Sequence, residues 1–346
     1  MKETFEKGQY MRSDFRGEVW INIHPDLLDT IVRINEDPVD GGYGDEKYAR
    51  RATELMQQNF REPIYTTFAV NGTAANVMAM KAMLDRWSAI VCATQTHINV
   101  YEAGALEFNL GNKILSVAGE NGKLTPARIE KLFAQTKNYK YNPKVVVLTQ
   151  PTEYGTVYTI EELKALCDFA HGKGMYVYVD GARLANALVA LDTDIGHMIG
   201  ETGVDAFSFG GTKAGALFGE MIVFRRAEFN NNLKYSQKQS LQHLAKSKFL
   251  SAPIARILET ELWKTNARIA NAAANRLADK LAEKGIRFAY PVQTNMVFAV
   301  IEPERFAKIT EEYALHYWED EADRVVRLAT TFQTTDEQID RFVGMI

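Results

Sequence analysis

Short apolar runs alternate with longer amphipathic stretches through most of the first 240 residues. The runs are continuous rather than alternating, which is typical of strands buried on both faces of a sheet. Several are separated by stretches whose apolar positions recur three and four residues apart, as in a helix. The pattern therefore predicts an α/β domain with a mostly parallel sheet. The strand candidates are residues 64–70, 89–94, 113–119, 144–149, 175–180, 205–210 and 220–224.

The pattern changes after a polar stretch at residues 230–239. Long helical periodicity covers 253–285, a strand candidate follows at 296–301, and a last helix follows the segment TTDEQ, which is typical of a smaller α+β domain. We therefore expect three parts: an N-terminal segment at 1–40 that fits neither pattern, a large α/β domain at 41–240, and a small C-terminal domain at 241–346.

Composition narrows the class of protein. The 346 residues are 46% hydrophobic and 24% charged, which excludes a disordered or membrane-embedded chain. A formal charge of −4 without charged blocks makes nucleic acid an unexpected partner. No apolar leader and no long apolar run is present, so we expect a cytoplasmic protein without a membrane partner. Cys92 and Cys167 lie in apolar settings without CxxC spacing, so we expect buried thiols and no metal site.

Ligands of an open parallel sheet bind beyond the carboxyl ends of its strands, so the residues after each run matter most. Gly72 and Thr73 follow the first run and begin a helix, where free N–H groups favour a phosphate; N-capping by Thr73 is the alternative. His97 follows the second run and could stack on a planar cofactor or be purely structural. The sequence lacks a GxGxxG fingerprint, so a nicotinamide cofactor is not supported.

Two further strand ends carry charged residues. Asp180 closes an apolar strand, so its carboxylate needs a positive partner, which could be a ligand or simply Arg183. Lys213 lies between Gly-Gly-Thr and Ala-Gly-Ala-Leu. Burial among small residues would lower its pKa and make the amine a nucleophile, whereas an exposed lysine in a glycine turn is the alternative.

Together these features fit one cofactor, pyridoxal 5'-phosphate (PLP). It requires a lysine for a Schiff base, an acid for its pyridine nitrogen, a phosphate cup and often an aromatic ring. Lys213, Asp180, Gly72 with Thr73, and His97 supply one of each.

At this point the chain resembles the threonine aldolase family, in the β-eliminating lyase group of fold type I (aspartate aminotransferase-like) PLP enzymes. The pairing of DGARL with GGTK is the specific part of the resemblance, and the other matches support it. The matching stretches are residues 12–14, 43–45, 72–76, 97–104, 150–155, 180–184, 208–217, 294–295 and 327–330.

The resemblance implies a role for each matching residue. Lys213 would carry the Schiff base, Asp180 would keep the pyridine nitrogen protonated, and His97 would stack on the ring and manage protons. The remaining cofactor contacts would come from Gly72, Thr73, Thr212 and Arg183. Ser13, Arg183 and Arg327 would hold the substrate carboxylate, for which a guanidinium fork is suited.

Two positions depart from the family pattern. Glu153 stands where well-known members have a second histidine, so the base for the substrate hydroxyl could be His97, Glu153 or a water held by them. A phosphate-binding arginine that the family takes from the neighbouring subunit is here a lysine, Lys248. A lysine offers a point charge instead of a fork.

The resemblance implies retro-aldol cleavage of L-threonine or L-allo-threonine, which are β-hydroxy-α-amino acids, to glycine and an aldehyde. It also implies a homodimer or homotetramer with shared active sites. The same scaffold could serve a related β-eliminating lyase or a phenylserine aldolase. A non-catalytic binding protein is disfavoured, because Lys213, Asp180 and Arg327 are all retained.

Overall fold

The seven strands predicted between residues 64 and 224 form one sheet in the computed structural model, which describes residues 11–38, 40–133 and 141–346, and the strand predicted at 296–301 lies in a second sheet. The strand order is β1-β7-β6-β5-β4-β2-β3. Only β7 runs against its neighbours in this sheet, pairing antiparallel with β1 and β6. The fold class predicted from the apolar runs is confirmed. The bounds are β1 Tyr65–Ala69, β2 Ala89–Ala93, β3 Lys113–Val117, β4 Pro143–Thr149, β5 Tyr176–Asp180, β6 Ala206–Gly210 and β7 Glu220–Phe224.

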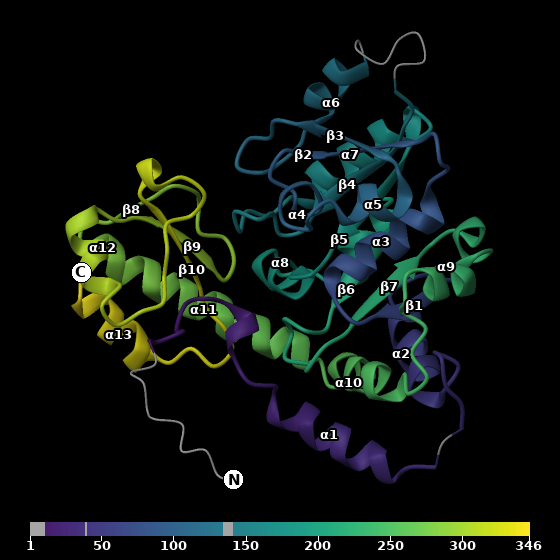
Figure 1. Ribbon diagram of the computed structural model, residues 1–346, viewed down its shortest axis with the longest axis horizontal. Coiled ribbons are helices and arrows are strands. Elements are labelled where there is room, and N and C mark those ends of the chain that lie inside the picture. Colours follow the sequence, from purple (N-terminus) through teal and green to yellow (C-terminus); the bar gives the residue numbers. More distant parts are fainter. Residues whose placement is uncertain (1–10, 39, 134–140) are drawn as a thin grey trace.

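Helices cover both faces of this sheet (Figure 1). Val146 and Val177 point into one apolar cluster and their neighbours Val145 and Tyr178 into the other, as expected for side chains that alternate along a strand. Double-sided burial explains why these runs lack polar positions. One face is covered by α2 (Lys47–Gln57), α6 (Pro126–Phe133), α7 (Ile160–Gly172), α8 (Leu184–Ala190) and α10 (Lys248–Glu259), and the other by α3 (Gly72–Met83), α4 (His97–Val100), α5 (Ala105–Leu110) and α9 (Leu233–Gln239).

A three-stranded antiparallel sheet of order β10-β9-β8 forms a second, smaller lobe. The long helix α11 (Leu262–Glu283) extends from the large lobe to this sheet (Figure 1). Residues of α11, β9, β10 and α13 share one apolar core. The remaining bounds are β8 Arg287–Phe288, β9 Met296–Val300, β10 Val325–Ala329, α12 Pro303–Ile309 and α13 Asp336–Gly344, with short turns η2 Gly196–Glu201, η3 Ala227–Asn230 and η4 Glu321–Asp323.

The N-terminal segment contacts both lobes, and its first ten residues lie outside the described part of the chain. Arg16 pairs with Ala329 beside β10, and a short turn η1 (Glu18–Trp20) follows. The helix α1 (Pro25–Glu36) then packs on α10. This segment therefore runs along the space between the lobes. No helix in the described ranges is both long and apolar enough to cross a membrane.

One predicted helix differs from the structure. The helix predicted over 253–285 is interrupted, because Glu261 adopts a left-handed φ of 52° between α10 and α11. Most of the polar stretch at 230–239, after which the pattern changes, forms α9, whose Leu233 is buried against the sheet.

Candidate active site

Asp180 and Lys213 come together because they follow neighbouring parallel strands. Asp180 ends β5, and Lys213 lies in the turn after β6. Two glycines allow these turns to pack closely. A Cβ on Gly181 would lie 2.0 Å from the carbonyl oxygen of Ser208, and one on Gly210 would lie 2.4 Å from that of Ala182. The glycines are thus required for the close approach of the two strand ends.

Lys213 is half-buried within this turn rather than exposed on its surface. Among the described residues, its amine has no hydrogen-bond or ion-pair partner. Burial, followed by the positive charge of Arg183, lowers the pKa of Lys213 from its ordinary value. A lysine with a lowered pKa carries more of the neutral, nucleophilic amine near neutral pH.

Asp180 is buried, and no described residue forms a salt bridge with its carboxylate. Its Oδ2 accepts a hydrogen bond from Asn76 Nδ2 at 3.0 Å, and its Oδ1 accepts one from the Ala182 N–H at 3.0 Å. The alternative of an Asp180–Arg183 ion pair is wrong, because Arg183 pairs with Glu18 instead. A buried carboxylate with only neutral donors is suited to a cationic N–H, such as that of a pyridinium ring.

A buried chain of hydrogen bonds links Asp180 to His97. Asn76 Nδ2 also donates to Glu102 Oε1 at 2.8 Å, and Glu102 Oε1 lies 2.8 Å from His97 Nδ1. The Oδ1 of Asn76 accepts from the Tyr178 hydroxyl at 3.0 Å, which fixes the amide. This network orients the imidazole from one side and leaves its Nε2 available. Asn76 and Glu102 lie within stretches that we matched to the family, but no local pattern assigns them this role.

Glu153 lies beside His97. Its Oε1 accepts hydrogen bonds from the backbone N–H of His97 at 2.6 Å and from the Thr149 hydroxyl at 3.1 Å. Burial and the nearby charge of Asp180 raise the pKa of Glu153 to about 7. A carboxylate with this pKa can take and return a proton near neutral pH.

The start of α3 offers free donors for an anion. Asn71 is the N-cap and its side chain accepts the Ala74 N–H at 2.9 Å, so the N-cap role considered for Thr73 is wrong. The N–H groups of Gly72 and Thr73, in the first turn, have no acceptor within the described ranges. A Cβ on Gly72 would meet nothing within 4 Å. The buried hydroxyl of Thr212 also lacks a hydrogen-bond partner within the described part of the chain. These donors fit a phosphate.

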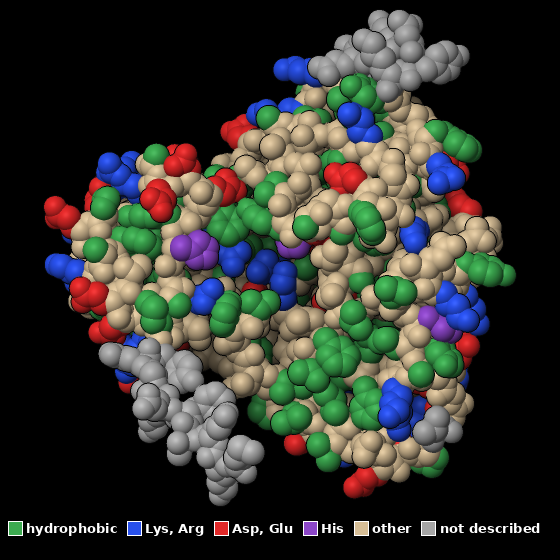
Figure 2. Space-filling view, in the orientation of Figure 1, with side chains coloured by type: hydrophobic (Ala, Val, Ile, Leu, Met, Phe, Trp, Pro, Cys, Tyr) green, Lys and Arg blue, Asp and Glu red, His purple; other side chains and the backbone are tan. Residues whose placement is uncertain are grey.

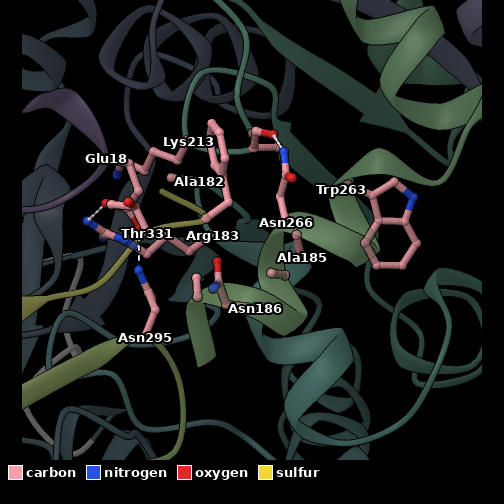
Figure 3. A pocket seen from close by; sticks show the side chains of 15 residues that line it. Glu18, Ala182, Arg183, Ala185, Asn186, Lys213, Trp263, Asn266, Asn295 and Thr331 are labelled. Atoms are coloured by element: carbon pink, nitrogen blue, oxygen red, sulfur yellow. Dashed lines mark hydrogen bonds and ion pairs between the residues drawn. The ribbon is translucent and has the colours of Figure 1, made fainter. Parts of the chain in front are cut away.

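Two arginines lie where a substrate carboxylate was expected. Arg183 donates through Nε and Nη2 to the two oxygens of Glu18, at 2.8 and 2.9 Å, and Asn295 Nδ2 donates to Glu18 at 2.7 Å (Figure 3). Arg327 stacks on Trp318 at 4.8 Å and has no carboxylate partner among the described residues. Burial and the charge of Arg183 lower the pKa of Arg327 to about 10, so it stays charged at neutral pH. Arg327 is therefore the cation left for a ligand.

The structure does not bring every expected residue to this place. The half-buried Ser13 has no hydrogen bond to Arg183 or Arg327 in the described ranges. Lys248 donates instead to the carbonyls of Ile34 and Asp37, at 2.7 and 3.3 Å, at the end of α1. Two carboxyl groups were missed. Glu18 comes from an irregular segment, and Glu220 of β7 has a pKa raised to about 8 by burial near Lys213.

These residues fit PLP. The unpartnered lysine, the buried carboxylate without a cation, and the open helix start supply the three contacts that this cofactor needs. On the surface, Lys, Arg and His side chains gather in a hollow between the lobes (Figure 2).

Known proteins resemble this chain in sequence and in fold. The family model of β-eliminating lyases matches residues 36–304. A low-specificity L-threonine aldolase of Pseudomonas aeruginosa is 35% identical over 287 residues, covering 82% of this chain and 83% of that protein. The structure of Leishmania major threonine aldolase has a TM-score of 0.90 at 28% identity, covering 96% of this chain and 98% of that one. A Thermus thermophilus aspartate aminotransferase variant shares the fold, with a TM-score of 0.70 at 15% identity over 94% of this chain and 88% of that one.

Proposed function

The chain belongs to the β-eliminating lyase family, whose members use PLP, and from this premise we propose that it cleaves β-hydroxy-α-amino acids to glycine and an aldehyde. L-Threonine and L-allo-threonine are the proposed substrates. Relatives named low-specificity L-threonine aldolases support this choice. The observation that carries it is the convergence of three charged groups without ionic partners among the described residues: Lys213, Asp180 and Arg327.

Each of these groups has a distinct task. When bound through its aldehyde to the Lys213 amine, PLP supplies an electron sink for a bond broken at the substrate Cα. Asp180 would hold a proton on the pyridine nitrogen, and the free N–H groups of Gly72 and Thr73 would hold the phosphate. Arg327 fixes the substrate carboxylate, which sets the orientation about Cα and thereby which bond is aligned for cleavage.

Glu153 is the proposed base for the substrate hydroxyl. Burial raises the pKa of Glu153 to about 7, so its carboxyl group can accept and return a proton near neutral pH. His97 Nδ1 is engaged by Glu102, which supports a positioning and stacking role for the imidazole. The backbone N–H of His97 donates to Glu153, which fixes the carboxyl group beside the backbone that carries the imidazole.

Product analysis tests this function. The PLP-loaded protein is incubated with L-threonine, L-allo-threonine, phenylserine and serine, and aldehyde is measured against pyruvate and ammonia. We expect glycine and acetaldehyde from the threonine isomers, and none of either from the Lys213→Ala variant. Pyruvate and ammonia without aldehyde would instead assign β-elimination. Benzaldehyde without acetaldehyde would assign a phenylserine aldolase.

We also propose that copies of the chain associate as a homodimer or homotetramer. Lys248 begins α10, and its amine donates to two carbonyls at the end of α1. The family resemblance implies that this lysine contacts the phosphate of another copy. Light scattering of the purified protein tests this association, and a monomer at micromolar concentration would contradict it.

A further inference from the structure

The carboxylate of Glu18 is held firmly in the cavity that Lys213 also lines. It accepts two hydrogen bonds from Arg183 and one from Asn295, all between 2.7 and 2.9 Å. Its side chain is only 5% exposed. Gly17, with a left-handed φ of 107°, turns the chain just before it, and a Cβ on Gly17 would lie 3.8 Å from Arg327 Nη2. Glu18 thus pairs with Arg183, and its neighbour Gly17 lies beside Arg327.

Glu18 occupies only some of the hydrogen-bond donors of the Arg183 guanidinium group. A guanidinium has five N–H donors, and Glu18 uses the edge formed by Nε and Nη2. The Nη1 group of Arg183 has no hydrogen-bond partner within the described part of the chain. Glu18 therefore fixes the plane of the guanidinium and leaves a second edge for a ligand.

The main effect of Glu18 is on the charge of the site. Burial has the largest single effect on the pKa of Glu18 and raises it. The charge and hydrogen bonds of Arg183 together outweigh burial, so the pKa of Glu18 is lowered to about 2. Glu18 is therefore ionised at neutral pH and cancels the charge of Arg183. Arg327 then remains as the cation of the pair without a carboxylate partner in the described part of the chain, which matches a ligand with one carboxylate.

We propose that Glu18 is a specificity-determining residue that restricts this site to substrates whose only anionic group is the α-carboxylate. The proposal rests on the function proposed above. A substrate with a second carboxylate finds Arg183 already neutralised and is repelled by Glu18. Selection of this kind works by penalising the wrong substrate as well as by binding the right one.

Kinetics with two substrates of different charge test this proposal. PLP-loaded wild type, Glu18→Gln and Glu18→Asp proteins are assayed with L-threonine and L-threo-3-hydroxyaspartate. In Glu18→Gln, the ratio of kcat/KM for hydroxyaspartate to that for threonine should rise by about tenfold or more, because one like charge is removed. Glu18→Asp keeps the charge and should keep the wild-type ratio. A ratio that stays within twofold in Glu18→Gln, or that rises equally in Glu18→Asp, would overturn the proposal.

A matched control and a binding measurement separate this inference from the proposed function. Asp26→Asn breaks a similar bidentate pair with Arg256, at 2.8 and 3.1 Å, outside the site, and should leave the ratio unchanged. Calorimetric titration with malate and 3-hydroxybutyrate, which lack an amino group, needs no turnover. Glu18→Gln should gain affinity for malate by about tenfold relative to 3-hydroxybutyrate. If wild type cleaves neither amino acid, the proposed function fails, while an unchanged malate preference in Glu18→Gln overturns the role of Glu18 by itself.

Discussion

Replacing Glu153 by glutamine should reduce turnover and stabilise the folded protein at the same time. Glutamine keeps the shape of the side chain, and its amide oxygen can still accept the hydrogen bond from the backbone N–H of His97. It cannot take a proton from the substrate hydroxyl. Since a positioned general base typically contributes about 10²- to 10⁴-fold, we expect kcat for threonine cleavage to fall within that range.

The effect on stability follows from the raised pKa. The pKa rises from its ordinary value of 4.5 to about 7 on folding. Each pKa unit is worth about 1.4 kcal/mol, so the ionised carboxylate costs the folded state up to about 3 kcal/mol above pH 7. Below pH 4.5 the group is protonated in both states and this cost is absent. Glu153→Gln should therefore gain stability over wild type as pH rises from 4.5 to 7, and keep that gain at pH 8.

Two assays check these expectations. Aldehyde release between pH 5.5 and 9 should give a wild-type kcat/KM profile with a rising limb near pH 7, and Glu153→Gln should lose that limb. Urea unfolding at pH 4.5 and pH 8 measures the stability difference. The exposed Glu304→Gln serves as the control and should change neither quantity. A Glu153→Gln protein with wild-type turnover would refute the base assignment. A difference in free energy of unfolding between Glu153→Gln and wild type that is the same at pH 4.5 and pH 8 would refute the raised pKa.

Two further substitutions test other parts of the structure. Arg327→Met should lower kcat/KM for threonine by about 30- to 1,000-fold, since loss of a buried charge partner costs about 2–4 kcal/mol, while Arg276→Met at an exposed ion pair should not. A loss below threefold in Arg327→Met would contradict its role as carboxylate ligand. Asp205→Asn should lower the free energy of unfolding by about 3–5 kcal/mol, because the buried Asp205 carboxylate pairs with His171 and Arg226. It should not change kcat, because Asp205 lies at the start of β6, away from the catalytic strand ends. Unchanged urea unfolding would show that this buried network does not stabilise the fold.

The sequence predicted the strands well because double-sided burial leaves an unambiguous apolar signal. It did not predict the strand order or the reversed direction of β7, since both depend on pairing between distant segments. The break at Glu261 was also missed, because a left-handed φ in a non-glycine residue has no local signature. β10 was not predicted as a strand, although Arg327 within it was matched to the family.

The candidate site was predicted where residues follow strands or carry a motif. Lys213, Asp180 and His97 were identified because their strand-end positions imply a shared edge of the sheet. Glu18 could not be found in this way, since it lies in a segment without periodicity and reaches Arg183 across 165 positions of the chain. The use of Asn76 and Glu102 as a bridge from Asp180 to His97 likewise depends on side-chain packing that no local pattern encodes.

Chemical trapping at Lys213 tests the central claim most directly. The PLP-loaded protein is reduced with borohydride, which converts a Schiff base into a stable amine, and its peptides are mapped by mass spectrometry. We expect the phosphopyridoxyl group on the peptide that contains Lys213, and no stable adduct in Lys213→Ala. Modification of a different lysine, or an unmodified Lys213 in protein that still cleaves threonine, would contradict the account.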